Sequence, residues 1–177
     1  MGRNSRNRDI VPGKKPFATL VTRVFFFCVG MGMQTAYRID PEVKKEVDSW
    51  PETFTFRMSV KDGPGMLVMK RAGQLQYLGE KEPFYTDVEL CFKHIVYAYL
   101  TMTGRISVPN AVYHNRQFVK GDLNLMMSIL RVMNVTQTLL LPNFLARFYI
   151  KEVPPLTLRK VINRGITYFN VAYGAIK

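Results

Sequence analysis

Strict alternation of apolar and polar residues over positions 54–60 is the feature that most limits what this chain can fold into. Four apolar residues alternate there with three polar ones, in the order Phe54, Thr55, Phe56, Arg57, Met58, Ser59 and Val60. A period of two over seven residues is typical of a strand with one buried face and one solvated face. The chain is therefore predicted to contain a sheet that is apolar on one side only.

The residues on either side of this strand predict further short elements. Lys61-Asp62-Gly63-Pro64-Gly65 has the chemistry of a turn, because Asp-Gly and Gly-Pro pairs favour turn conformations. Met66–Arg71 and Gln74–Leu78 then flank Ala72-Gly73 and predict a β-hairpin. Before the strand, residues 41–49 are predicted to form a short charged helical turn.

An apolar run near the N-terminus predicts a helix over about 17–36. Val24–Met33 holds ten residues without a charge, whereas a spanning helix needs roughly 20 mostly apolar residues. Basic residues before such a run resemble a signal peptide, but Gln34-Thr35-Ala36 is a poor cleavage site. We expect a helix that packs on the domain or lies in a membrane interface, with a signal sequence as the open alternative.

Residues 86–103 allow two interpretations. As one helix, the segment would begin with a capping box made by Thr86 and Glu89. As a strand followed by a helix, Val88 and Phe92 would share one strand face and the helix would start near His94. Periodicity alone does not decide between them.

The C-terminal half of the chain predicts mostly helices. Gln117–Lys120 is a brief strand, and Asp122 then caps a helix over Leu123–Leu141 that Pro142 ends. Ser107 is placed to cap a short helix with Pro109 in its first turn. Residues 153–177 predict an amphipathic terminal helix with a basic face.

Charge is concentrated at the two ends of the chain. Residues 1–38 carry seven basic residues against Asp9 alone, and residues 153–177 carry four basic residues and no acid, whereas 39–152 holds fourteen basic and twelve acidic residues. These basic ends can attract an anionic membrane surface or an acidic partner. No aromatic-flanked basic motif of a nucleic-acid-binding fold is found, so we expect no nucleic acid partner.

The sequence contains no recognisable catalytic or metal-binding motif. Cys91 and His94 have C-x-x-H spacing but lack a second ligand pair, and no G-x-S-x-G elbow is found. Gly63-Pro64-Gly65 lacks the Lys and Ser/Thr of a phosphate loop. Cys28 and Cys91 suggest no disulfide, which favours a reducing compartment. Paired carboxylates stay open, although the candidates lie in or beside turns: Asp62, Glu80, Glu82 and Asp87.

Residues 87–130 resemble the sterol carrier protein 2 superfamily of lipid-binding domains. The first part is similar to the family's strand that runs directly into a helix ending in Thr103-Gly104, and it reads DVELCFKHIVYAYLTMTG. The second part, VPNAVYHNRQFVKGDLNLMMSIL, resembles the family's short helix around Pro109 and Ala111, its brief strand Phe118–Lys120, and the Gly121-Asp122 turn. The resemblance extends over about 54–141 and favours a break at His94.

This resemblance implies an α+β fold, with a five-stranded, mostly antiparallel sheet covered by helices that enclose an apolar cavity. Extra helices are expected at both ends of the chain. The implied division is a basic N-terminal segment with an apolar helix (1–49), a lipid-binding domain (50–152) and an amphipathic basic helix (153–177). The family is implied to bind sterols, fatty acyl chains or isoprenoid quinone precursors without catalytic residues, metal or cofactor.

We expect the ligand to contact apolar side chains of the predicted strands and helices: Phe92, Leu100, Phe118, Met126, Met127, Leu130 and Met133. Methionine suits this task because it is flexible and polarisable. The expected function is non-enzymatic binding of an apolar lipid near a membrane, in a cytoplasmic or peripheral membrane protein. The alternative is a structural or oligomerising module of a membrane-associated complex, and a homo-oligomer stays open in either case.

Overall fold

The computed structural model describes residues 15–81, 85–103, 105–106 and 113–140, together with residues 165 and 169. These residues form a five-stranded sheet in the order β3-β2-β1-β4-β5. The strands are β1 (Phe54–Val60), β2 (Gly65–Arg71), β3 (Gln74–Gly79), β4 (Val88–Phe92) and β5 (Gln117–Gly121). The β1–β4 pair is parallel and the other neighbours are antiparallel. The predicted α+β fold with a mostly antiparallel sheet is confirmed.

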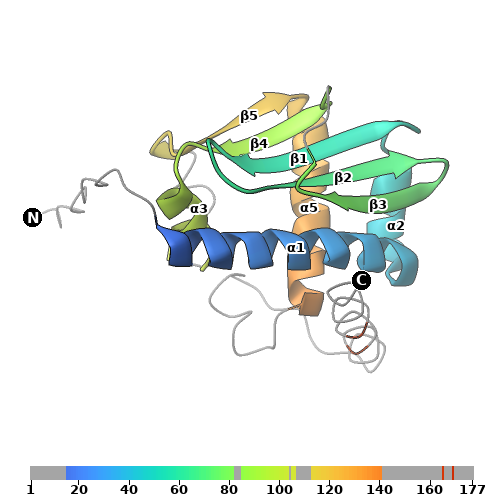
Figure 1. The fold of residues 1–177 in the computed structure, drawn as a ribbon. Helices are drawn as coiled ribbons and strands as arrows, with labels where there is room; N and C mark the ends of the chain where they lie inside the picture. The colour runs from blue at the N-terminus through green and yellow to red at the C-terminus, as the bar shows by residue number, and fades with distance from the viewer. Residues whose placement is uncertain are drawn as a thin grey trace, which may run out of the picture.

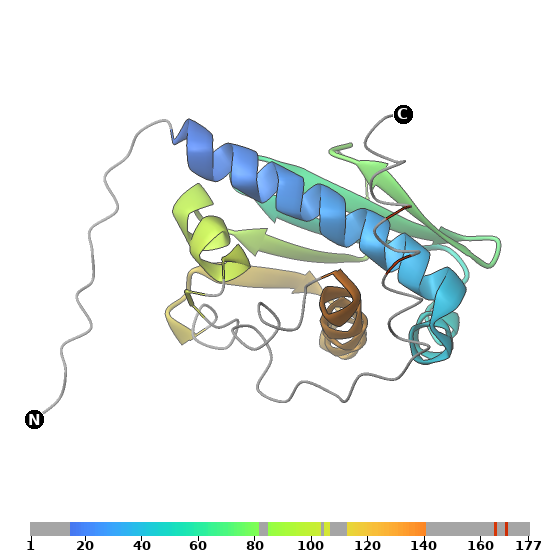
Figure 2. The same cartoon turned by 90° about the horizontal axis from the view of Figure 1, so that it is seen from below.

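Four helices complete the described fold: α1 (Pro16–Ile39), α2 (Pro41–Asp48), α3 (Ile95–Met102) and α5 (Leu123–Leu140). Figure 1 shows α1 running along one face of the sheet, with α3 near its N-terminal end and α2 at its C-terminal end. Figure 2 views the molecule from below, where α1 lies over the strands and α5 stands beside them. Helix α5 packs against α1 and α2, and α1 also contacts β2 and β3. We call the side of the sheet that carries α1 the covered face and the other side the open face.

Capping side chains at two junctions explain why α2 and α3 begin where they do. The Asp40 carboxylate accepts hydrogen bonds from the backbone N–H of Glu42 (2.9 Å) and Val43 (3.2 Å), so it caps α2 directly after α1 ends. The His94 Nδ1 atom accepts from the N–H of Val96 at 3.2 Å and caps α3. The strand-then-helix interpretation of 86–103 is therefore confirmed, and the single-helix alternative is wrong.

The remaining elements of the described residues follow the sequence predictions closely. Asp122 caps α5 by accepting from the N–H of Asn124 at 2.6 Å. Between β2 and β3, Ala72 and Gly73 both have positive φ angles of 50° and 66°, as a tight hairpin turn requires. The short helix predicted after Ser107 and the terminal helix predicted over 153–177 lie outside the described residues.

The core lies between the covered face and the helices. Strand register places Phe56 beside Val88, Met58 beside Leu90 and Val60 beside Phe92 on this face. These side chains join one buried cluster with residues of α1 and α5, among them Phe26, Val29, Met33, Met126, Ile129 and Met133. Fully burying each such side chain contributes about 1.5–3 kcal/mol to folding.

Two glycines allow α1 to approach its neighbours closely. A Cβ atom on Gly30 would overlap the ring of Tyr77 on β3, and one on Gly32 would lie 2.8 Å from Cγ2 of Thr136 on α5. In a well-packed interior, neither position has room for a side chain on the glycine. The C-terminal half of α1 is therefore packed tightly between the sheet edge and α5.

Candidate functional site

The candidate site is the interior bounded by the covered face, α1, α3 and α5. Of the predicted ligand contacts, Phe92, Met126 and Met133 are buried and belong to the core cluster here. Leu130 is half-buried and packs against that cluster, and Leu100 is half-buried on α3. The structure thus brings Phe92, Leu130 and the two buried methionines together. Their role as ligand contacts stays a prediction.

Phe118 and Met127 lie elsewhere, and their predicted convergence with the others is corrected. Phe118 pairs in register with Cys91 rather than with Phe92, so it projects from the open face. Successive residues of a strand point to opposite faces, so a shift of one residue in the pairing moves a side chain to the other face of the sheet. The Nζ atom of Lys120 lies 5.5 Å from the centre of the Phe118 ring on that face. The side chain of Met127, one residue beyond the buried Met126, is 57% exposed.

Helix α1 contributes interior residues that the sequence-based site omitted. Phe26, Val29 and Met33 are buried against the covered face. Their spacing of three and four residues within the apolar run is the signal of one helical face. The prediction that this helix packs on the domain is confirmed.

Among the described residues, Lys70 is a buried cation of the interior, and its donors are all used. Its ammonium donates to the carbonyl oxygens of Val47 (2.8 Å), Asp48 (3.2 Å) and Trp50 (2.7 Å). These carbonyls lie at and just beyond the C-terminal end of α2, where carbonyl groups lack helical partners. Lys70 therefore links α2 to the sheet, and its ammonium group has no donor left for another partner.

The described residues do not form a recognisable catalytic or metal-binding group. No group of three or more His, Cys, Asp or Glu that could hold a metal is found among them. Burial raises the pKa of the Cys28 thiol, which keeps it protonated and a poor nucleophile at neutral pH. Cys91, on the open face, is free and buried, and His94 uses Nδ1 to cap α3.

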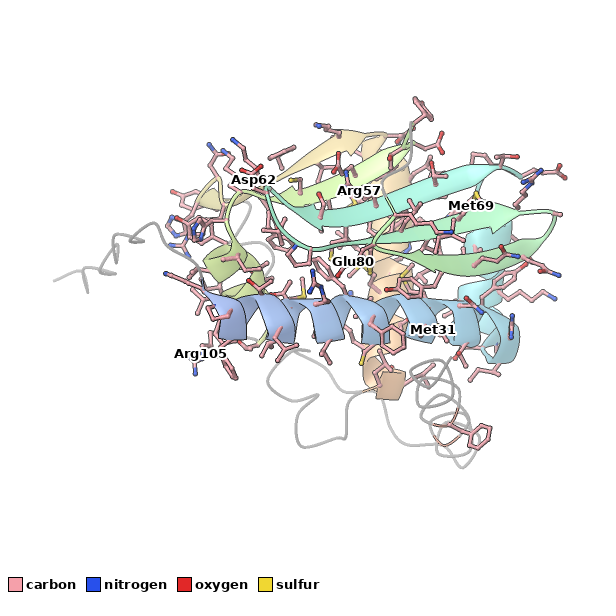
Figure 3. All side chains as sticks on the ribbon, viewed as in Figure 1. Met31, Arg57, Asp62, Met69, Glu80 and Arg105 are labelled. Carbon is pink, nitrogen blue, oxygen red and sulfur yellow. The ribbon has the colours of Figure 1, made fainter. Side chains whose placement is uncertain are left out.

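The open face carries a polar network centred on Glu89, beside apolar residues such as Met69 and Phe118. The Ser59 hydroxyl donates to its carboxylate at 2.8 Å, and nitrogens of Arg57 and Lys120 each lie 3.5 Å from it. Figure 3 shows Arg57 projecting from this face, with Met69 on the same side. Opposite charges at neighbouring positions stabilise a sheet surface. The polar groups of this face therefore satisfy one another.

Two grooves formed by described residues lie outside the interior. One, of about 590 Å³, lies between α2 and α5 and is lined by Glu42, Val43, Lys45, Glu46, Ser49, Arg131, Val132 and Val135. The other, of about 380 Å³, is lined by Tyr37, Arg38, Lys44, Gly73, Gln74 and Leu75. Neither groove contains a predicted ligand contact. Charged residues line both grooves, and in the first of them Glu46 pairs with Arg131 at 2.8 Å.

The side of α1 that faces away from the core carries an apolar stripe. Phe17, Leu20 and Val24 are each more than half exposed, and their spacing places them on one helical face. Within the described residues, α1 is the one helix long and apolar enough to cross a membrane, with a mean hydropathy of 1.5 over its best window. Core helices and signal sequences share this property, and 39% of the window is buried here.

Comparison with known proteins finds similarity in structure. No protein-family model matches the sequence, and no curated protein matches it. A solved structure named UbiJ-SCP2 ubiquinone synthesis protein is 15% identical, with a TM-score of 0.45, over 68% of this chain and 99% of that chain.

Two further solved structures are similar over comparable lengths. Sterol carrier protein domain 2 of Helicoverpa armigera is 14% identical, with a TM-score of 0.41, over 71% of this chain and 94% of that chain. The apo form of sterol carrier protein 2 from Yarrowia lipolytica is 13% identical, with a TM-score of 0.39, over 67% and 98%. All three carry SCP2 or sterol carrier protein in their names.

Proposed function

We propose that this chain binds an apolar lipid without transforming it chemically, and that the lipid occupies the interior between the covered face and helices α1, α3 and α5. The observation that carries the proposal is the composition of this interior. Its described residues are mostly apolar, with many Phe, Met and Val side chains, and the ammonium of Lys70 donates its hydrogen bonds to three carbonyl groups. An environment of this kind favours apolar guests over water.

Methionine makes the interior adaptable. Met33, Met58, Met66, Met126 and Met133 are all buried there. Their side chains have three rotatable bonds, so they can fill the space without a ligand and rearrange around one. Each buried ligand methylene contributes about 0.8 kcal/mol, so a chain of roughly fifteen carbons gains on the order of 10 kcal/mol before the costs of association.

The ligand classes that fit this proposal are sterols, fatty acyl chains and isoprenoid quinone precursors, as the resemblance of residues 87–130 implies. Transfer or presentation of the bound lipid would follow from reversible binding.

Native mass spectrometry of the gently purified full chain tests this function. We expect a complex heavier than the protein by the mass of a lipid, which solvent extraction then releases for identification. A bare oligomer would instead favour the alternative, a structural module of a membrane-associated complex. Bare monomer after expression in a lipid-rich host would contradict lipid binding.

We further propose that the exposed stripe of α1 docks on anionic membranes from the cytoplasmic side. Apolar insertion of Phe17, Leu20 and Val24 would act together with attraction between basic residues and headgroups. Flotation with vesicles containing phosphatidylserine tests this, with binding expected to weaken as salt rises. Leu20→Glu should remove flotation, whereas Met127→Glu, a matched change at an exposed position of α5, should not. Equal flotation of both variants would contradict docking through α1.

A further inference from the structure

Three buried threonines stand out because each lies on a different helix of the interior. Thr22 is on α1, Thr101 on α3 and Thr136 on α5, with exposed fractions of 0%, 7% and 0%. The side-chain oxygen of each has no hydrogen-bond partner among the residues that the structure describes. Leaving a buried hydroxyl unpaired destabilises a protein, and native structures rarely do so without a reason.

Other threonines of the same helices satisfy their hydroxyls in the usual way. Thr19 on α1 donates to the Lys15 carbonyl at 3.0 Å. Thr103, at the end of α3, donates to the Tyr99 carbonyl at 2.7 Å, and Thr138 on α5 donates to the Val135 carbonyl at 2.6 Å. Helical threonines commonly form such bonds to the preceding turn. Their absence at the three interior positions is therefore a property of those positions and not of threonine in these helices.

The unpaired hydroxyls are spread along the buried side of α1. Thr22 lies in the N-terminal half of α1, against which α3 packs, and Phe17 and Tyr99 form an aromatic contact between the same two helices with ring centres 6.3 Å apart. Thr136 lies beside Gly32, since a Cβ on that glycine would be 2.8 Å from its Cγ2. Ten helical residues separate Thr22 from Gly32, which corresponds to about 15 Å along the helix. A long ligand lying under α1 would pass both places.

The charges of the interior restrict which polar group a ligand can carry. Lys70 gives its three hydrogen bonds to backbone carbonyls, and the buried Asp40 caps α2. A carboxylate or phosphate brought into this interior would find no free cation among the described residues to offset its loss of hydration. A hydroxyl or a carbonyl group would need only the hydrogen bond that a threonine hydroxyl supplies.

We propose that the interior selects a neutral lipid with a single hydroxyl or carbonyl group, and that Thr22 and Thr101 hydrogen-bond this group. The proposal rests on the proposed lipid-binding function and adds the chemical class of the ligand. These two threonines form the anchor because they belong to two helices that pack together at one end of α1. Thr136 then lies along the hydrocarbon part of the ligand.

The test compares three probes of equal chain length that differ only at the end: hexadecanol, hexadecane and palmitic acid. Binding to the full-length protein is measured by native mass spectrometry titration, and stability is measured by thermal unfolding without ligand. We expect hexadecanol to bind more tightly than the other two. Thr22→Val and Thr101→Val should each weaken hexadecanol binding about five- to tenfold, because one hydrogen bond is lost, and should leave hexadecane binding unchanged.

The same two variants should be more stable than the parent without ligand, because valine has the shape of threonine and no unpaired hydroxyl. A rise of a few degrees, roughly 2–4 °C, in the unfolding midpoint is expected for a chain of this length. The matched controls Thr19→Val and Thr103→Val remove hydroxyls that do have partners. They should not rise in stability and should keep the preference for hexadecanol.

Several results would overturn the inference. One is tighter binding of palmitic acid than of hexadecanol. Another is lower stability of both Thr22→Val and Thr101→Val than of the parent. A third is loss of the preference for hexadecanol in Thr136→Val alone. Binding of hexadecane and hexadecanol with equal affinity would reject the threonine anchor and leave lipid binding intact. Failure of all three probes to bind would reject the proposed function together with it.

Discussion

The covered and open faces of the sheet are made by the same strands and differ in how their polar groups are satisfied. Strand β1 places Phe56 and Met58 on the covered face and Arg57 and Ser59 on the open face. On the open face, Glu89 is satisfied by the groups around it. On the covered side, apolar side chains surround hydroxyls that have no partner among the described residues. The Glu89 network is thus satisfied within the open face, whereas the interior contains hydroxyls without a partner among the described residues.

The largest effect should come from truncating a side chain of the covered face. Phe56→Ala removes a fully buried ring from the centre of the core, and we expect a loss of about 3–5 kcal/mol in the free energy of unfolding. The matched change on the open face, Met69→Ala, should cost less than about 1.5 kcal/mol. Urea denaturation of both variants measures the difference. Similar losses would mean that the two faces are equally packed.

A second, smaller effect should separate two lysines of the sheet. Lys70→Met leaves three carbonyl groups at the end of α2 without their donor, at an expected cost of roughly 2–3 kcal/mol. Lys120→Met removes an exposed partner of Glu89 and should change stability by less than about 1 kcal/mol. If Lys120→Met proved the more damaging, the open face would be the part that stabilises the fold.

Glu46 of α2 contacts Ser128 and Arg131 of α5, and we call these contacts the α2–α5 clamp. The clamp should make the stability of the protein depend on pH. Hydrogen bonds from Arg131 and then from Ser128 lower the pKa of Glu46. A carboxyl group with a lowered pKa contributes stability above its unfolded pKa of about 4.3, and this contribution is lost as pH falls through the folded pKa. Glu46→Gln should therefore flatten the decline in the unfolding midpoint between neutral pH and pH 3. An unchanged slope would show that this clamp does not hold the helices.

The smallest effect is expected at the centre of the open face. Glu89→Gln keeps the shape of the side chain and its bond with Ser59 but removes the charge that Arg57 and Lys120 approach. Ion pairs near a solvated surface contribute about 0–1 kcal/mol. Lipid binding, measured by native mass spectrometry, should be unchanged. A loss of lipid from this variant would place the ligand on the wrong face for our account.

Local patterns were sufficient to predict most of the described fold. The alternation over 54–60, the Ala72-Gly73 turn and the caps at His94 and Asp122 all depend on neighbours within a few residues, so each could be recognised from the sequence. Lys70 was also recoverable in principle. It follows Met66 and Val68 at a period of two, which places it on the covered face.

The site was harder to predict because several segments are apolar on adjacent positions. Phe118 and Val119 are neighbours in a short strand, and only the pairing with β4 shows that Phe118 faces outward. Met126 and Met127 are likewise adjacent on α5, and only tertiary packing shows that the second is exposed. Thr22 carries no local signal, since its missing hydrogen bond is a property of the folded interior.

Methionine methyl groups allow the central claim to be tested directly, because the chain places them on both sides of the sheet. With ¹³C-labelled methionine methyls, we expect hexadecanol to shift the NMR signals of the interior residues: Met33, Met58, Met66, Met126 and Met133. The signals of Met69 on the open face and Met127 on the exposed side of α5 should stay in place. Shifts confined to Met69 and Met127, or no shift at a saturating concentration, would contradict a lipid site in the covered interior.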